Sequence, residues 1–186
     1  GGDVWVANQG SSSVSEFDSS GAAISPAGGY TGGGIDAPAG LALDPAGNVW
    51  ISDYYTNSVT ELLGGNTPPA SCPQTPAPGD SGCPLSPAGG FTGGGLDAPN
   101  SVAVDSAGNV FITNFHGQSI TELDAGGQAL SPTAGYGDAS LVLPSGIATD
   151  PSGNVWVADF GDDLITKFIG LATPVKTPLL GAPAHP

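Results

Sequence analysis

Basic side chains are almost absent from this sequence. Lys167 and Lys176 are the only two among 186 residues, against 17 Asp and Glu, so the formal net charge is −15. Proteins that bind nucleic acids or anionic membranes use clustered Lys and Arg side chains to neutralise phosphates. The sequence has no such cluster, so we expect no nucleic acid partner. The acidic side chains are spread singly, which is typical of a solvated surface; a collective surface that binds divalent cations is the alternative.

Long hydrophobic runs and metal-type cysteine patterns are also missing. No apolar run approaches the roughly 20 residues that a membrane-spanning helix needs, so we expect no membrane insertion. Cys72 and Cys83 are the only cysteines, and neither a CxxC motif nor a Cys/His metal pattern includes them. We expect a local disulfide between them. This favours an oxidising compartment, and hence a secreted or extracellular protein.

Glycine and proline, by contrast, are abundant, and both recur at fixed positions of a repeat. The 31 Gly and 18 Pro therefore indicate ordered turns rather than a disordered chain. Each repeat contains an aromatic residue between two β-branched residues. The four copies are Val4-Trp5-Val6, Val49-Trp50-Ile51, Val110-Phe111-Ile112 and Val155-Trp156-Val157. The aromatic residues lie 45, 61 and 45 positions apart, and a period near 45 in short β-type segments is typical of β-propeller blades.

The repeat predicts four strands in each blade. A first strand of alternating small and apolar residues follows a proline, at 40–44, 101–105 and 146–150. A turn containing Gly-Asn leads to the aromatic strand, and an alternating third strand follows at 13–17, 58–62, 119–123 and 164–168. The fourth begins before Ser-Pro, at Ile24, Leu85 and Leu130. We therefore predict an all-β fold, a β-propeller built of about four four-stranded blades.

One domain is expected over residues 1–186. Its blades are predicted at about 1–34, 35–95, 96–140 and 141–180, and the first blade lacks its inner strand. The extra 16 residues of the longest interval belong to a cysteine-bearing insertion at 66–84. A Pro-rich tail is expected at 170–186, in which 175–180 would add an outer strand to the last blade.

The repeated aromatic residues are expected to pack between adjacent blades, because aromatic side chains bury more area than any others. These are Trp5, Trp50, Phe111 and Trp156; a platform for stacking sugars is the alternative. The insertion also predicts possible O-glycosylation, because hydroxyl residues lie near prolines there. The candidate positions are Thr67, Ser71 and Thr75.

Three phrases of the repeat resemble a known family over nearly the whole chain. They are Pro-x-x-(Ile/Val/Leu)-Ala-x-Asp, Gly-Asn-Val-Trp and Ser-Val-x-Glu-(Phe/Leu). They are similar to NHL-repeat β-propellers, particularly the secreted bacterial group related to streptogramin lyases. The resemblance implies a propeller fold, five or more blades in most relatives, and usually a binding or scaffold role. Fold does not fix activity, because propellers host many functions.

Catalytic and cofactor motifs are not apparent. The resemblance implies that the lyase group uses His and Glu with a divalent metal near the central face. Here His116 is the single histidine inside the repeats, and His185 lies in the tail. No HExxH motif or nucleophile elbow occurs. We therefore expect no catalytic residue and no cofactor, with a lyase-like enzyme as the alternative.

The incomplete first blade suggests a function. An unpaired inner strand exposes hydrogen-bonding groups and apolar surface that need a cover. Other copies of the chain, or upstream propeller blades, are the expected partners. The sequence thus favours a secreted, non-catalytic protein that self-assembles into an oligomer or filament by strand complementation. A carbohydrate-binding module that uses Tyr54, Tyr55 and Phe115 to hold glycans is a further alternative.

Overall fold

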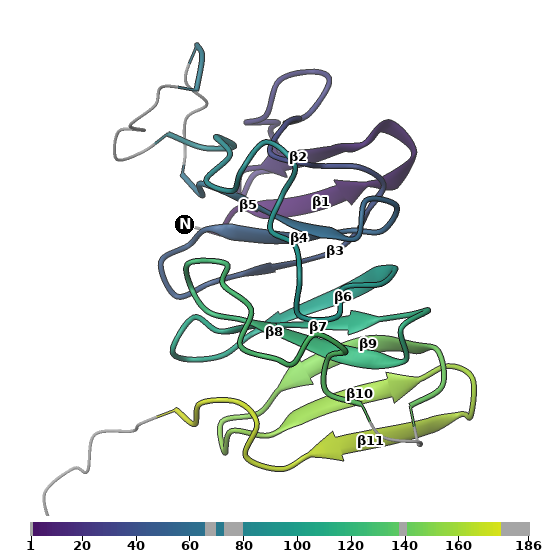
Figure 1. Ribbon diagram of the computed structural model, residues 1–186. Coiled ribbons are helices and arrows are strands. Elements are labelled where there is room, and N and C mark those ends of the chain that lie inside the picture. Colours follow the sequence, from purple (N-terminus) through teal and green to yellow (C-terminus); the bar gives the residue numbers. More distant parts are fainter. Residues whose placement is uncertain (1, 66–69, 73–79, 138–140, 176–186) are drawn as a thin grey trace, which may run out of the picture.

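The computed structural model describes residues 2–65, 70–72, 80–137 and 141–175 (Figure 1). Those residues form short β-strands and one 3-10 helix, η1 (Gln9–Ser11). No helix in this described part is long and apolar enough to cross a membrane. The strands are β1 (Val4–Asn8), β2 (Ser13–Phe17), β3 (Pro38–Leu43), β4 (Val49–Asp53), β5 (Ser58–Leu62), β6 (Pro99–Val104), β7 (Val110–Asn114), β8 (Ser119–Leu123), β9 (Pro144–Thr149), β10 (Val155–Asp159) and β11 (Leu164–Phe168).

Four antiparallel sheets make up the fold, each one a blade. Blade 1 is β1–β2, and blades 2 to 4 are β3–β4–β5, β6–β7–β8 and β9–β10–β11. The blades follow one another in a single row (Figure 1), and the inner strands β3, β6 and β9 lie side by side. This arrangement confirms the predicted all-β propeller with about four blades.

The turn between the first and second strands of a blade is built by an aspartate. In blade 2, Asp44 Oδ1 accepts the backbone N–H of Asn48 at 2.9 Å, and the Asp44 carbonyl accepts the N–H of Gly47 at 3.0 Å. Gly47 has a φ of 90°, which disfavours any residue with a Cβ. Asp105 and Asp150 form the same turn in blades 3 and 4. The repeated Asp-x-x-Gly-Asn phrase therefore closes three hairpins in one register.

The predicted fourth strands are reduced to isolated bridges. Each of the first three blades has two of them: Val14↔Tyr30 and Phe17↔Ala23, Val59↔Phe91 and Leu62↔Pro84, and Ile120↔Tyr136 and Leu123↔Ala129. The Ser-Pro pair interrupts the ladder, because proline has no N–H to donate. In blade 1 the Ser25 hydroxyl accepts the backbone N–H of Glu16 at 3.1 Å. A side chain thus replaces part of the expected ladder, and the blades have fewer regular strands than predicted.

The hydrophobic core lies between the blades. Trp50 clusters with Val102, Val110 and Ile112 of blade 3, and Phe111 clusters with Val155 of blade 4. Trp50 and Phe111 are fully buried. Their rings bury large apolar areas, so these contacts hold each blade to the next.

Blade 1 has no inner strand in the described part of the chain. β1 pairs with β2 alone, in the register Val4↔Phe17 to Asn8↔Ser13. In the other blades the second strand pairs on both sides. One edge of β1 therefore presents backbone groups that its counterparts use in a ladder.

The segment after β11 crosses the turns of blades 3 and 4. The Thr173 N–H donates to Asp105 Oδ2 at 2.7 Å, and the Val175 N–H donates to the Pro151 carbonyl at 3.0 Å. Val175 thus lies against a turn of blade 4 rather than along β11, where an outer strand was expected. Residues 176–180 of that expected strand are outside the described residues.

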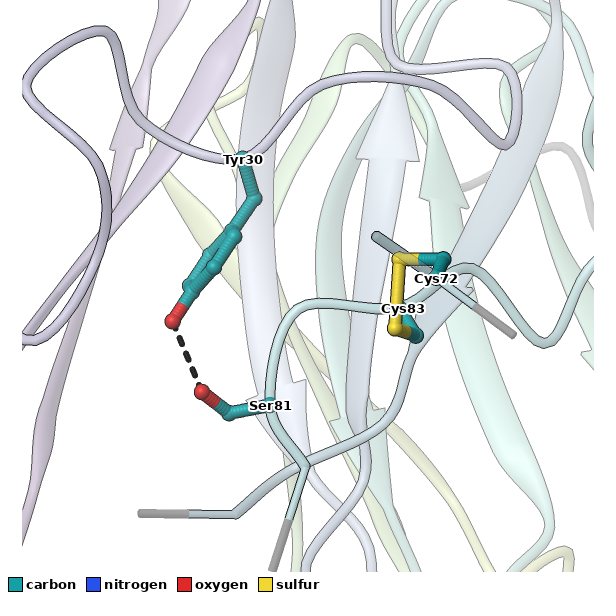
Figure 2. The surroundings of a disulfide bond; sticks show 4 residues. All are labelled: Tyr30, Cys72, Ser81 and Cys83. Carbon is teal, nitrogen blue, oxygen red and sulfur yellow. Dashed lines mark hydrogen bonds between the residues drawn. A yellow bond between two sulfur atoms is a disulfide. The ribbon is translucent and has the colours of Figure 1, made fainter. Parts of the chain in front are cut away.

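The described C-terminal end of the insertion contacts blade 1, as Figure 2 shows for Ser81 and Tyr30. Cys72 and Cys83 form a disulfide. The Ser81 hydroxyl lies 2.7 Å from the Tyr30 hydroxyl. Of the residues named for O-glycosylation, Ser71 is exposed, whereas Thr67 and Thr75 are outside the described residues.

Candidate interaction surfaces

The last blade exposes a face that the middle blades bury. We call it the trailing face: Gly146, Ala148, Trp156, Ala158 and Ile165. Trp156 is 39% exposed and Ile165 is 72% exposed, whereas the equivalent Trp50 and Val59 of blade 2 are 0% exposed. The trailing face lines a shallow, mostly apolar hollow of about 220 Å³. Two large apolar side chains, Trp156 and Ile165, are thus exposed on one face of the last blade.

The space around two equivalent glycines shows how closely blade 3 approaches the corresponding face of blade 2. A Cβ at Gly40 of blade 2 would lie 2.5 Å from the carbonyl oxygen of Asn100 in blade 3. At the equivalent Gly146, the nearest atom to such a Cβ is the Ala158 side chain of the same blade, at 3.5 Å. No described residue of another blade packs over Gly146, so the trailing face lacks the cover that blade 3 gives to the corresponding face of blade 2.

The first blade exposes the face that, in the other blades, packs against the preceding blade. We call it the leading face: Val4, Val6 and Phe17. Val4 is 54% exposed and Val6 is 39% exposed. The equivalent valines and isoleucines of the other blades are all 0% exposed: Val49, Ile51, Val110, Ile112, Val155 and Val157.

The leading and trailing faces correspond to the two sides of the contact that joins neighbouring blades inside the chain. Inside the chain, the aromatic residue of one blade packs on the β-branched residues of the next, as Trp50 does on Val110 and Ile112. Trp156 and Val6 are the corresponding partners at the two ends of the row, and neither has such a neighbour in the described part of the chain. The two faces thus carry the residue types that pack against each other between neighbouring blades.

Of the four repeated aromatic residues, three therefore lie between blades and one does not. Trp5 packs against Val49 and Ile51 of blade 2. At Trp156, the ammonium nitrogen of Lys167 lies over the ring instead, 4.7 Å from its centroid. This is a cation–π contact, and the sequence pattern did not reveal it.

A group of rings lies in the loops after β4 and β7. Tyr54 contacts Tyr55 and His116, with ring centroids 5.4 and 5.9 Å apart, and Phe115 contacts His116 at 5.6 Å. The Tyr54 hydroxyl lies 3.4 Å from His116 Nε2. His116, the one histidine inside the repeats, thus contacts aromatic side chains. The described residues include no group of three or more His, Cys, Asp and Glu side chains that could hold a metal.

Buried carboxylates lie inside the blades. Burial raises the pKa of Asp53 to about 7, although the Thr60 hydroxyl at 2.7 Å and the Asp36 N–H at 3.2 Å donate to it. Burial also raises the pKa of Glu61 to about 7, with Asp44 adding to the effect and the Asn48 amide opposing it. These groups tie strands to loops, and they are proton-binding sites near neutral pH.

Known proteins share this architecture. The NHL repeat family model matches residues 141–168. A streptogramin B lyase structure superposes with a TM-score of 0.62 at 16% identity, covering 93% of this chain and 51% of the other. Virginiamycin B lyase from Staphylococcus aureus gives 0.59 at 15% identity, covering 90% and 52%. A chain of a nidogen–laminin complex gives 0.53 at 17% identity, covering 89% and 55%.

The chain spans about half the length of these solved structures. A search of curated protein sequences finds no match. At such low identities the superpositions establish the fold and leave activity open. The chain therefore contains an NHL repeat and has the fold of the streptogramin-lyase-like β-propellers.

Proposed function

We propose that this chain is a secreted, non-catalytic propeller protein that assembles by docking its trailing face on the leading face of another copy. The observation that carries the proposal is the complementarity of the two faces, which are halves of the interface that already joins blades 1 to 4. The unpaired edge of β1 is a second feature that a strand from another copy would complete.

The geometry of such docking is head to tail. A contact between two different faces produces a closed ring if the rotation closes and a filament if it does not. Because the chain spans about half of its solved relatives, two copies joined at both ends would have a length close to one complete propeller. We therefore favour a closed pair over a filament.

Further observations support an interaction role. The Cys72–Cys83 disulfide fits an oxidising compartment. One similar structure is that of a protein–protein complex, of nidogen and laminin. His116 contacts the aromatic rings of Tyr54 and Phe115.

A mixing experiment tests the assembly. Val6→Glu places a charge on the leading face, and Ile165→Glu places one on the trailing face. Each variant alone should be monomeric by light scattering after size exclusion, because every contact needs one intact face of each kind. An equimolar mixture should form a one-to-one dimer, because each variant supplies the face that the other lacks.

The matched control is Leu130→Glu, which puts the same charge on an exposed leucine outside both faces (49% exposed). It should assemble as the unmodified chain does. A monomeric unmodified chain, or a mixture that stays monomeric, would overturn the proposal; the first result would also fit a longer protein in which further blades cover both faces.

The ring cluster favours a second candidate function, glycan binding. Tyr55 is 74% exposed beside Tyr54 and His116, and exposed rings stack on the apolar faces of sugars. Binding on a glycan array that is lost in Tyr54→Ala but kept in Tyr30→Phe would support this function. An array without any bound glycan would argue against it.

A further inference from the structure

A cavity lies between blades 1 and 2. It has a volume of about 420 Å³ and is bordered by Asp3, Trp5, Glu16, Leu43 and Gly64, among others. Trp5 points toward blade 2, on the side of β1 opposite to Val4 and Val6. The cavity is therefore separate from the leading face, and it is far from the trailing face in the row of blades (Figure 1).

Glu16 is the unusual residue of this cavity. Its side chain is 0% exposed. Oε2 accepts the Tyr30 hydroxyl at 2.8 Å, but Oε1 is buried without a hydrogen-bond partner. A buried carboxylate oxygen without a donor costs free energy, so an absent donor is expected at this position.

The next blade shows what the missing donor is. In blade 2 the equivalent Glu61 accepts the side-chain amide of Asn48 on Oε1, at 3.0 Å. Blade 1 has Asp3 at the position of Asn48, since Asp3-Val4-Trp5 aligns with Asn48-Val49-Trp50. An amide donor is thus replaced by a carboxylate, and two acidic groups share the cavity without a donor from Asp3.

The last blade shows that a cation fits this register. Lys167 is opposite Trp156 in the strand pairing, as Glu16 is opposite Trp5. Its ammonium group lies over the Trp156 ring. The same chain therefore already places an alkylammonium group on the tryptophan that corresponds to Trp5.

We propose that the cavity between blades 1 and 2 binds a primary alkylammonium group, such as a lysine side chain, held by Asp3 and Glu16 beside the Trp5 ring. An ammonium has three N–H donors and no acceptor, which matches the unpartnered Glu16 Oε1 and the Asp3 carboxylate. The Leu43 side chain and the Trp5 ring supply apolar wall for an alkyl chain. Ca²⁺ fits less well, because it takes six to eight oxygen ligands and this site offers two carboxylates.

Proton linkage follows from the same geometry. Burial, followed by the opposing Tyr30 and Ser81 hydrogen bonds and then by repulsion from Asp3, leaves the pKa of Glu16 above its usual range. A bound ammonium favours the ionised form. Binding should therefore release a proton and strengthen as the pH rises through the pKa of Glu16.

Calorimetric titration of the full chain with Nα-acetyl-lysine methylamide tests the proposal at low ionic strength. We expect one site per chain. Asp3→Asn restores the blade 2 donor for Glu16 Oε1, and it should lower the association constant at least tenfold without unfolding the protein. Asp162→Asn is the matched control, because it removes one acidic charge from blade 4, and it should change the constant less than twofold.

Glu16→Gln gives a second, independent readout. It should abolish both binding and the buffer-dependent heat that reports proton release. No binding, binding that Asp3→Asn leaves intact, or binding of Ca²⁺ in place of the amine would each overturn the proposal. Val6→Glu and Ile165→Glu should keep the site, so its failure and a failure of self-assembly can be told apart.

Discussion

At the scale of single residues, one position at the end of the second strand makes the same two hydrogen bonds in blades 2 to 4, with either Asp or Asn. In blade 2, Asp53 joins the Asp36 N–H to the Thr60 hydroxyl. In blade 3, Asn114 joins the Asp97 N–H to the Thr121 hydroxyl. Asp and Asn side chains are nearly isosteric, so the choice between them determines whether the side chain can bind a proton and leaves its shape almost unchanged.

The first prediction follows from the raised pKa of Asp53. The folded state binds the Asp53 proton more tightly than the unfolded state, so this proton stabilises the protein below the usual aspartate pKa. The stabilisation is lost as the pH rises toward about 7. Asp53→Asn should therefore reduce the fall in unfolding free energy between pH 4.5 and pH 7.5 by about 1–3 kcal/mol.

Urea unfolding at the two pH values measures this change. Asp36→Asn is the control, since it removes a nearby charge but keeps the buried carboxyl. An unchanged slope in Asp53→Asn would show that Asp53 does not bind a proton in this range.

At the scale of elements, one strand motif has two environments. β4 and β10 follow the same hairpin turn and have the same pairing register. Trp50 of β4 is opposite Glu61 of β5, and Trp156 of β10 is opposite Lys167 of β11. Yet β4 is buried throughout, whereas Trp156 and Ala158 of β10 are exposed. The two strands differ in burial because blade 3 covers β4, whereas no described blade follows β10.

Matched truncations should reveal this difference. Trp50→Ala removes a fully buried ring from the contact between blades 2 and 3, and it should cost about 3–5 kcal/mol. Trp156→Ala should cost only about 1 kcal/mol in a monomeric background such as Ile165→Glu, because its ring is partly exposed, with Lys167 over the ring and the indole N–H donating to Asp150 Oδ2 at 2.9 Å. Urea unfolding in that background compares the two, and equal losses would contradict the assignment of the trailing face.

At the scale of the whole molecule, the blades form a row with two unlike ends (Figure 1). Three blade contacts are made inside the chain, and the fourth is offered by Val6 at one end and Trp156 at the other. The proposed assembly uses this fourth contact. The prediction from mixing Val6→Glu with Ile165→Glu belongs to this scale, because no single blade contains both faces.

Much of the fold could be predicted from the sequence. The Asp-x-x-Gly-Asn turns and the alternating strands depend on neighbours within a few residues, and their register follows the repeat. The outer strands were the main departure. Their Ser-Pro and Gly-Gly pairs contain the signal, since a proline cannot donate to a ladder and Ser25 takes over the Glu16 N–H.

The candidate surfaces depended on tertiary structure. Sequence alone determined that Trp5, Trp50 and Trp156 occupy one strand position, because that follows from local spacing. It could not determine that Trp50 is buried while Trp156 is exposed, or that Asp3 faces Glu16 in a cavity, because burial and electrostatic partnership depend on which blade lies alongside. The repeat thus specified the blades, and their packing decided which of those side chains are left to bind something else.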